Sequence, residues 1–272
     1  MAGGKRLTGR KRAIRICLSG ALGRMGRELA RLVGEAQDLE LVSALERGDH
    51  AELGREIAPG LRVTAGLDEA LGPADVLLDF SLPEAVLAHA RAAAAASMPV
   101  VTGTTGLDEA SLRRLRECAE RVPVVWSANM SRSVHLLRAL VRHAARELGS
   151  EDFDAEILEA HHRHKLDAPS GTARELAEAI AAERGGEAVF GRAGLRKRGE
   201  VGLASLRGGD LAGEHRVCFL GAGEQIEIVH RATTREHFCR GALDAVRFVA
   251  APGRAPGLYS SEDVFGAVGG RR

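Results

Sequence analysis

The fold is decided by the segment Ile14-Arg15-Ile16-Cys17-Leu18-Ser19-Gly20-Ala21-Leu22-Gly23-Arg24-Met25-Gly26. Its apolar start predicts a buried strand, and the residues after Gly26 predict a helix. The three glycines allow a tight turn that brings backbone N–H groups and a helix N-terminus against a pyrophosphate. Glu46 follows about 20 residues later, where a carboxylate that holds ribose hydroxyls is expected. The spacing is GxxGxxG and not GxGxxG, so an ordinary glycine-rich turn is the alternative.

Apolar runs and helical stretches alternate onward from Ala13, which favours βαβ units and a doubly wound parallel sheet. The expected strands are Ile14–Leu18, Leu39–Leu45, Val76–Phe80, Pro99–Val101 and Val122–Trp126, with helices at Arg24–Val33, Glu84–Ser97 and Glu109–Arg121. Two polar stretches follow strands, Gly103-Thr104-Thr105-Gly106 and Ser127-Ala128-Asn129-Met130. Open α/β sheets bind their ligands at such strand ends, although a turn or a helix cap is an equal alternative.

The pattern changes after Asn129, where strands begin to follow strands. A helix is expected at Val134–Leu148 and another at Ala173–Arg184, among strands at Phe153–Glu159, Val201–Leu206, His215–Phe219 and Gln225–His230. This order suggests a mixed or antiparallel sheet in a second domain. A last helix, Arg235–Ala250, is expected to lead the chain back to the first domain.

Composition excludes several classes of protein. Lys and Arg (38) balance Asp and Glu (37) to a formal charge of +1, so tight nonspecific binding to nucleic acid is not expected. No stretch approaches the roughly 18 apolar residues of a membrane helix, so no membrane partner is expected. The four cysteines lie far apart, as in a reduced cytoplasmic protein. Residues 1–12 are basic and are expected to form a disordered head.

The least ordinary segment is Glu159-Ala160-His161-His162-Arg163-His164-Lys165-Leu166-Asp167-Ala168-Pro169-Ser170-Gly171-Thr172-Ala173. Histidines and a lysine at a strand end supply general acids near neutral pH and cations for an anionic substrate. Thr172 and Glu175 are spaced as a capping box, and the free N–H groups of that helix start suit a carboxylate. A solvated basic loop is one alternative. A metal site is another, but the familiar zinc spacing is missing, so no metal is expected.

These motifs resemble the 4-hydroxy-tetrahydrodipicolinate reductase family, also called dihydrodipicolinate reductases, of bacterial lysine biosynthesis. The resemblance extends from Ile14 to Gly266. Its specific parts are Gly20 to Gly26, Gly103-Thr104-Thr105-Gly106, Glu159 to Ala173, Arg207-Gly208-Gly209-Asp210 and Gly213-Glu214-His215. It implies an α/β fold with a Rossmann-type parallel sheet at 13–130, completed by 241–272. A smaller α+β substrate and oligomerisation domain with a mixed sheet is implied at 131–240, in a homotetramer.

The resemblance also implies roles for individual residues. His161 is expected to be the principal proton donor and Lys165 the second one. His162, Ser170, Gly171 and Thr172 are expected to contact the substrate. NADH or NADPH is the implied cofactor, in contact with Gly20, Ala21, Leu22, Gly23, Arg24, Met25, Glu46, Arg47, Gly103, Thr104, Thr105, Ser127, Ala128, Asn129 and Met130.

The sequence departs from the family pattern at two positions, and two alternatives to the reductase function stay open. The family usually carries glycine and asparagine where this chain has Ser133 and His135. These substitutions concern the hinge between the domains or the way the nicotinamide is held. The alternatives are a regulatory module that senses NADPH without turnover and an amino-acid dehydrogenase of related architecture.

Overall fold

The computed structural model describes residues 12–266, so the expected basic head lies outside the described residues except for Arg12. Arg12 pairs with Asp75 at an Nη2–Oδ1 distance of 3.0 Å. The described chain divides into two compact units. Unit 1 contains residues 12–128 and 239–264, and unit 2 contains residues 129–238 and 265–266. Asn129 and Met130 therefore fall in unit 2.

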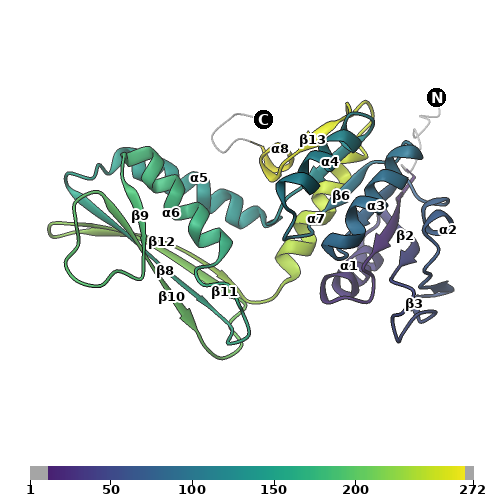
Figure 1. Ribbon diagram of the computed structural model, residues 1–272, viewed down its shortest axis with the longest axis horizontal. Helices are drawn as coiled ribbons and strands as arrows, with labels where there is room; N and C mark the ends of the chain where they lie inside the picture. The colour runs from purple at the N-terminus through teal and green to yellow at the C-terminus, as the bar shows by residue number, and fades with distance from the viewer. Residues whose placement is uncertain (1–11, 267–272) are drawn as a thin grey trace, which may run out of the picture. The chain divides into compact units, whose positions relative to one another are not determined.

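Unit 1 is built on a six-stranded sheet in which all neighbouring strands are parallel (Figure 1). In spatial order its strands are β13 (Gly257–Tyr259), β7 (Pro123–Trp126), β6 (Val100–Thr102), β5 (Val76–Asp79), β1 (Ile14–Ser19) and β2 (Leu39–Leu45). The order runs outward from β1 in both directions. The winding therefore reverses between β1 and β5, the position at which such sheets open a crevice for a ligand.

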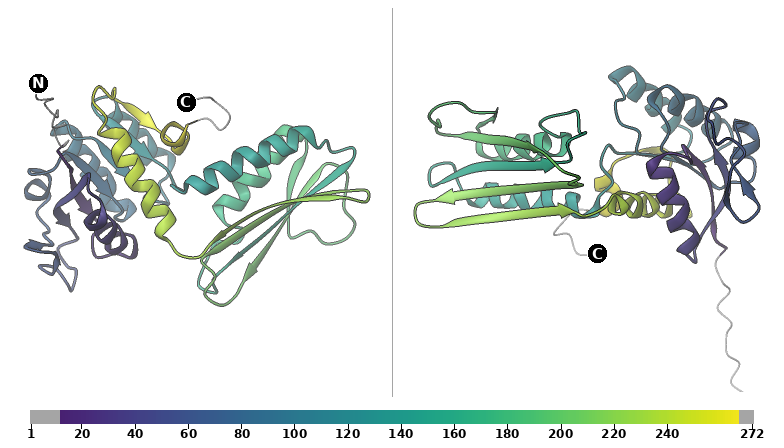
Figure 2. Two further views of the ribbon diagram at one scale, coloured as in Figure 1. Left: turned by 180° about the vertical axis from the view of Figure 1, so that it is seen from behind. Right: turned by 90° about the horizontal axis from the view of Figure 1, so that it is seen from below.

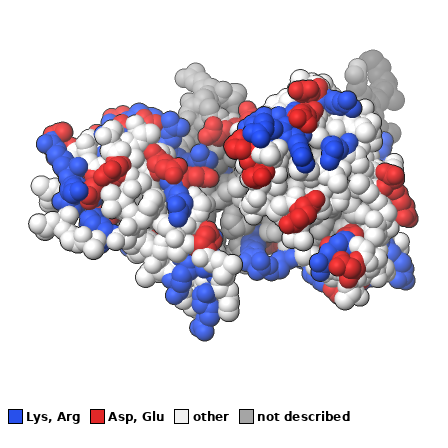
Figure 3. Space-filling view, in the orientation of Figure 1, with Lys and Arg blue, Asp and Glu red and all other residues white. Residues whose placement is uncertain are grey.

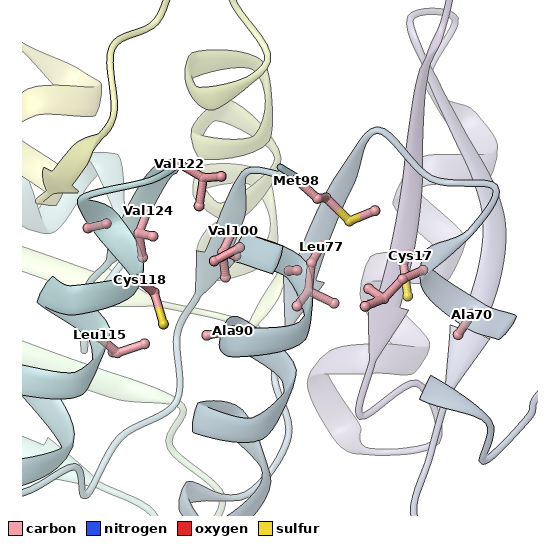
Figure 4. Packing of buried hydrophobic residues seen from close by; sticks show 14 of the residues in the cluster. Cys17, Ala70, Leu77, Ala90, Met98, Val100, Leu115, Cys118, Val122 and Val124 are labelled. Carbon is pink, nitrogen blue, oxygen red and sulfur yellow. The ribbon is translucent and has the colours of Figure 1, made fainter. Parts of the chain in front are cut away.

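Helices cover both faces of this sheet. Figures 1 and 2 show α3 (Pro83–Ala95) and α4 (Glu109–Ala119) over one face, with α1 (Arg24–Glu35) and α7 (Glu236–Val249) over the other. Alternate strand residues point to alternate faces, so Leu77, Val100 and Val124 pack against α3 and α4, as Figure 4 shows. Each such side chain contributes about 1.5–3 kcal/mol by its burial. The shorter elements of this unit are β3 (Glu56–Ala58), β4 (Leu61–Arg62), α2 (Leu67–Leu71) and α8 (Ser261–Phe265), the last of which ends at the first residue of unit 2's final segment.

Unit 2 contains a mixed five-stranded sheet. In spatial order its strands are β12 (Gln225–Ala232), β11 (Gly213–Gly221), β8 (Phe153–His161), β10 (Glu200–Arg207) and β9 (Glu187–Phe190). The pairs β12/β11 and β11/β8 are antiparallel, whereas β8/β10 and β10/β9 are parallel. α5 (Arg132–Glu147) and α6 (Gly171–Arg184) pack on one face over a core that includes Ile157, Leu176 and Phe219.

The other face of the unit 2 sheet carries no helix in the described chain (Figure 1). Leu158, Leu206 and Leu220 lie on it and are 37–56% exposed. Charged pairs surround them, among them Arg231 with Glu214 and Arg216 with Glu227. Lys, Arg, Asp and Glu also intermingle on the molecular face drawn in Figure 3. On that face, no large patch carries a single sign of charge.

The expected fold class is confirmed, with a Rossmann-type parallel sheet and a second mixed sheet. The expected strand Phe153–Glu159 is two residues longer, which makes His161 the last residue of β8. Six short elements have no counterpart in the sequence analysis, namely β3, β4, β9, β13, α2 and α8. Over residues 12–266, no helix is long and apolar enough to cross a membrane.

Candidate functional site

A pocket of about 420 Å³ lies in unit 1 at the carboxyl ends of β1, β2 and β5. Its position coincides with the reversal of winding described above. The pocket is lined by Ser19, Gly20, Gly23, Leu45, Glu46, Arg47, Gly48, His50, Ala65, Leu67, Phe80, Ser81, Leu82, Ala85 and His89. The glycine turn and the residues that follow β2 therefore share one pocket, as the sequence analysis expected of Gly20, Gly23, Glu46 and Arg47.

The glycine turn beside this pocket packs tightly against neighbouring backbone, which is possible because its glycines lack side chains. Gly20 has φ +73°, and a Cβ there would lie 2.6 Å from the carbonyl oxygen of Phe80. A Cβ on Gly26 would collide with the carbonyl oxygen of Gly20. Gly23 begins α1 without any side-chain cap, so the first N–H groups of that helix have no side-chain acceptor. This cradle and the open helix start fit the pyrophosphate of a dinucleotide.

Glu46 and Arg47 lie at the rim of the same pocket. The Glu46 carboxylate accepts hydrogen bonds from the backbone N–H groups of Leu22 and Arg47, each at 3.1 Å. Arg47 is largely exposed and pairs with Asp49 at 3.3 Å. The carboxylate is thus fixed beside the glycine turn, whereas the guanidinium has room to move.

The remaining residues expected at the cofactor do not line this pocket. Gly103 packs against the Phe80 ring, and Thr104 Oγ1 donates to the carbonyl oxygen of Ser81 at 3.1 Å. Gly103 and Thr104 therefore contact Phe80 and Ser81, which line the pocket, without lining it themselves. Asn129 donates its side-chain Nδ2 to Thr172 Oγ1 at 2.9 Å, within unit 2.

Asp79 is a residue of this region that the sequence analysis missed. It is fully buried at the end of β5, 2.7 Å from His89 Nδ1. Ser81 donates to it from both its backbone N–H and its hydroxyl. A carboxylate directly after a buried apolar run was the available signal.

The second candidate site is centred on His161 in unit 2. This side chain is largely buried, and its Nδ1 lies 2.5 Å from Oε2 of the fully buried Glu159. A Cβ added to Gly213 on β11 would lie 2.9 Å from the other ring nitrogen, Nε2. A side chain at this position would clash with Nε2, so glycine lets β11 pass close to the ring.

Glu159 connects β8, β10 and the start of α6 in unit 2. Arg207 on β10 donates to both of its oxygens, at 3.0 and 2.7 Å, and the backbone N–H of Ser170 donates at 3.2 Å. Burial raises the pKa of the Glu159 carboxyl, but the hydrogen bonds from His161 and Arg207 outweigh it and hold that pKa well below its ordinary value. Glu159 is therefore ionised and accepts only, so His161 Nδ1 carries the hydrogen of their bond.

His215 on β11 faces His161 edge-on, with 5.3 Å between the ring centroids. Its Nε2 lies 3.1 Å from Ser170 Oγ. Burial, and next the nearby His161 and His230, lower the pKa of His215 to about 4. His215 is therefore uncharged near neutral pH. Glu159, Arg207 and His215 lie in sequence motifs quoted above, but no role was expected of them from the sequence.

The loop after β8 brings Lys165 and the start of α6 to the same end of the sheet. Lys165 Nζ pairs with Asp167 at 2.8 Å and is partly exposed. The expected capping box of Thr172 and Glu175 is wrong, because Ser170 is the N-cap and its hydroxyl accepts from the N–H of Ala173 at 3.3 Å. The N–H groups of Gly171 and Thr172 thus form the open first turn of α6.

His162, Ser133 and His135 also lie in unit 2. The His162 Nδ1 is buried and, within the described residues, has no hydrogen-bond partner. Ser133 Oγ lies 3.0 Å from His230 Nε2, and His135 Nε2 lies 3.0 Å from the carbonyl oxygen of Gly266. The two departures from the family pattern therefore make contacts inside this unit.

Over residues 12–266, no three His, Cys, Asp or Glu side chains are placed to hold a metal ion. The chemistry available at the His161 cluster is proton transfer from an imidazole and an ammonium group. The open helix start beside it suits an anion.

Comparison with known proteins gives consistent matches over nearly the whole chain. Residues 14–130 match the family model of the dihydrodipicolinate reductase N-terminus, and residues 133–265 match that of its C-terminus. The 4-hydroxy-tetrahydrodipicolinate reductase of Thiobacillus denitrificans is 44% identical over 267 residues, covering 93% of this chain and 99% of that protein. The enzyme of the same name from Alkalilimnicola ehrlichii is 46% identical over 269 residues, covering 93% and 98%.

A solved structure is similar as well. It is a dipicolinate-bound dihydrodipicolinate reductase from Paenisporosarcina, with a TM-score of 0.77 and 25% sequence identity. The similarity covers 92% of this chain and 98% of that one.

Proposed function

Because the chain belongs to the dihydrodipicolinate reductase family, we propose that unit 1 holds the nicotinamide cofactor and that unit 2 binds and protonates the substrate. The enzyme is an oxidoreductase that uses NADH or NADPH in the diaminopimelate route to lysine. It reduces 4-hydroxy-tetrahydrodipicolinate or dihydrodipicolinate to tetrahydrodipicolinate. The matches do not favour a regulatory module without turnover or an amino-acid dehydrogenase.

The cofactor residues that we propose are those expected from the sequence, Gly20 to Met25, Glu46, Arg47, Gly103 to Thr105 and Ser127 to Met130. The bound dinucleotide supplies a hydride. The open start of α1 receives its pyrophosphate, and Glu46 accepts hydrogen bonds from ribose hydroxyls. The glycine cradle and the Glu46 carboxylate fixed at Leu22 support this placement.

The protons come from unit 2. Reduction of a conjugated C=C–C=N system leaves an adjacent carbon that needs a proton. His161 supplies it from Nε2, because Glu159 occupies Nδ1. Lys165 is the second donor and faces the substrate as a cation. The observation that carries this proposal is a histidine held by a buried carboxylate at the strand end that leads to Lys165 and α6.

The two carboxylates of the substrate need separate partners. One is held by the N–H groups of Gly171 and Thr172 at the start of α6, together with Ser170. The other is held by Lys165 and His162. The unpartnered Nδ1 of His162 in the described chain supports a contact there. When the substrate binds, the Lys165 ammonium group then leaves its ion pair with Asp167 and pairs with the substrate carboxylate.

We further infer a homotetramer in the cytoplasm. The open face of the unit 2 sheet presents Leu158, Leu206 and Leu220 between charges of both signs, which suits a second copy of the same face. The four cysteines are free. This agrees with a reducing compartment.

Dipicolinate tests the substrate site, because it is flat, dianionic and similar in shape to the substrate. We expect it to compete with substrate and to bind Lys165→Ala about tenfold or more weakly than wild type, since a charge-assisted hydrogen bond contributes about 1.5–3 kcal/mol. Calorimetry gives the Kd, and inhibition kinetics give the mode.

Lys197→Ala is the matched control, because Lys197 is an exposed lysine of the same unit. Its Kd for dipicolinate should equal that of wild type. Noncompetitive inhibition, or equal weakening by both substitutions, would place the substrate elsewhere.

A further inference from the structure

Glu159 joins several residues around His161 by hydrogen bonds. It is fully buried, and it receives hydrogen bonds from His161, from the N–H of Ser170 and twice from Arg207. A carboxylate of this kind is costly to bury unless it is paired. Its partners lie on β8, on β10 and at the N-cap of α6.

We propose that Glu159 and Arg207 are an opposed pair of positioning residues that set how readily His161 gives up its proton. Glu159 holds Nδ1–H and favours the charged imidazole ring. Arg207 donates hydrogen bonds to both oxygens of the same carboxylate and offsets part of its negative charge. Arg207 thereby weakens the stabilisation of the charged ring by Glu159. This inference rests on the proposed role of His161 as proton donor.

The geometry fixes which atom of His161 does the chemistry. Because the Glu159 carboxylate is an acceptor, Nδ1 keeps its hydrogen in both charge states of the ring. Nε2, which lies close to Gly213, is then the nitrogen that gains and loses a proton. Glu159 thus selects the tautomer of His161, and Glu159 and Arg207 together set the charge beside the ring.

The other groups around His161 have smaller or opposing effects. His215 faces it from β11 as an uncharged ring, because burial and then His161 and His230 lower the pKa of His215 to about 4. From the loop after β8, Lys165 disfavours a second positive charge, but Asp167 pairs with it at 2.8 Å. Glu159 and Arg207 are the charged pair in direct hydrogen-bonded connection with the ring.

The test is the pH dependence of kcat at saturating substrate and cofactor. A general acid must be protonated, so kcat falls as pH rises through the midpoint of the alkaline limb. Glu159→Gln removes the negative charge and should move that midpoint to lower pH by about one unit or more, the usual effect of a charge at this distance. Arg207→Met removes the positive partner of the carboxylate, while the hydrogen bond from the Ser170 N–H remains, and should move the midpoint to higher pH.

Opposite shifts are the outcome that a purely structural role does not produce. Arg142→Met is the matched control, because Arg142 is exposed on α5 and pairs with Glu183. It should leave the midpoint unchanged. Shifts in the same direction, or no shift in either variant, overturn the inference.

Loss of folding in a variant does not end the test. If Glu159→Gln does not fold, Arg207→Met should still raise the midpoint, and Arg207→Lys should keep it near wild type. In ¹⁵N-labelled wild-type enzyme, the histidine resonances that vanish in His161→Gln must show the neutral ring protonated at Nδ1. Protonation at Nε2 would refute the assignment.

His161→Gln also separates this inference from the proposed function. If that variant keeps the wild-type alkaline limb, His161 is not the donor and the proposed function fails. If it loses the limb while Glu159→Gln and Arg207→Met leave the midpoint in place, only the inference fails.

Discussion

The two candidate sites are built from opposite materials. In unit 1 the pocket borders a turn whose close backbone packing requires glycine at Gly20 and Gly26, and α1 begins there without a side-chain cap. In unit 2 the site is made of side chains, with the buried Glu159 and the partly buried Arg207 beside His161. A site that only holds a polyanion can use backbone N–H groups, whereas a site that moves a proton needs groups that titrate. Substitutions in the two units should therefore fail in different ways.

The largest effect should come from His161→Gln. We expect kcat to fall about 10²–10⁴-fold with little change in substrate KM, because a general acid acts mainly in the transition state. Steady-state kinetics at fixed pH measure both values. Cofactor Kd, measured by fluorescence, should stay at the wild-type value. An unchanged kcat would mean that His161 is not the proton donor. The proposed difference between a unit that binds cofactor and a unit that transfers a proton would then be wrong.

Gly26→Ala should give the reverse pattern in unit 1. Its Cβ would meet the Gly20 carbonyl oxygen, and overpacking of a closed position costs about 1–3 kcal/mol. We expect cofactor Kd to rise by roughly fivefold to 100-fold on that basis, with dipicolinate binding retained. Gly34→Ala on the same helix meets nothing within 4 Å and is the control. Equal cofactor affinity in the two variants would show that the glycine turn does not hold the dinucleotide.

Arg47→Ala should give the smallest effect and tests cofactor choice. In the proposed cofactor site, a carboxylate at Glu46 would favour NADH by accepting from ribose hydroxyls, whereas Arg47 would pair with the 2′-phosphate of NADPH. We expect both cofactors to work in wild type. The substitution should raise KM for NADPH more than KM for NADH. The difference should correspond to at most about 1.5–3 kcal/mol of binding free energy, the contribution of a charge-assisted hydrogen bond.

Competition from Asp49 for the Arg47 guanidinium keeps the effect below that limit. Arg62→Ala removes another exposed arginine of unit 1 and should change neither KM. Equal changes for the two cofactors at fixed ionic strength would mean that Arg47 does not recognise the 2′-phosphate.

Much of the fold could be predicted because its main elements carry local patterns. β1 and β5 are short apolar runs between turn residues, and these patterns alone indicate buried parallel strands. β13 and β9 could not be predicted in this way. Each is only three or four residues long, and β13 becomes a strand by pairing with β7, more than 100 residues earlier in the chain. Such pairings depend on tertiary contacts and not on local propensity.

The site shows the same division. His161 and Lys165 stand out in the sequence because titratable residues are concentrated there. Arg207 lies 48 residues from Glu159, and only the parallel pairing of β8 and β10 brings them together. The predicted capping box is wrong for a local reason, because Ser170, two residues before Thr172, is the N-cap and supplies the capping hydroxyl. Thr172 accepts instead from Asn129.

We propose that unit 1 and unit 2 both contribute to the reduction that this chain catalyses. The most direct measurement couples the purified protein to a dihydrodipicolinate synthase reaction and follows the absorbance of the reduced nicotinamide. We predict a decline with NADPH and with NADH that depends on the synthase and is nearly absent with His161→Gln. A flat trace with both cofactors, from protein that still binds them, would mean that this chain does not catalyse the reduction.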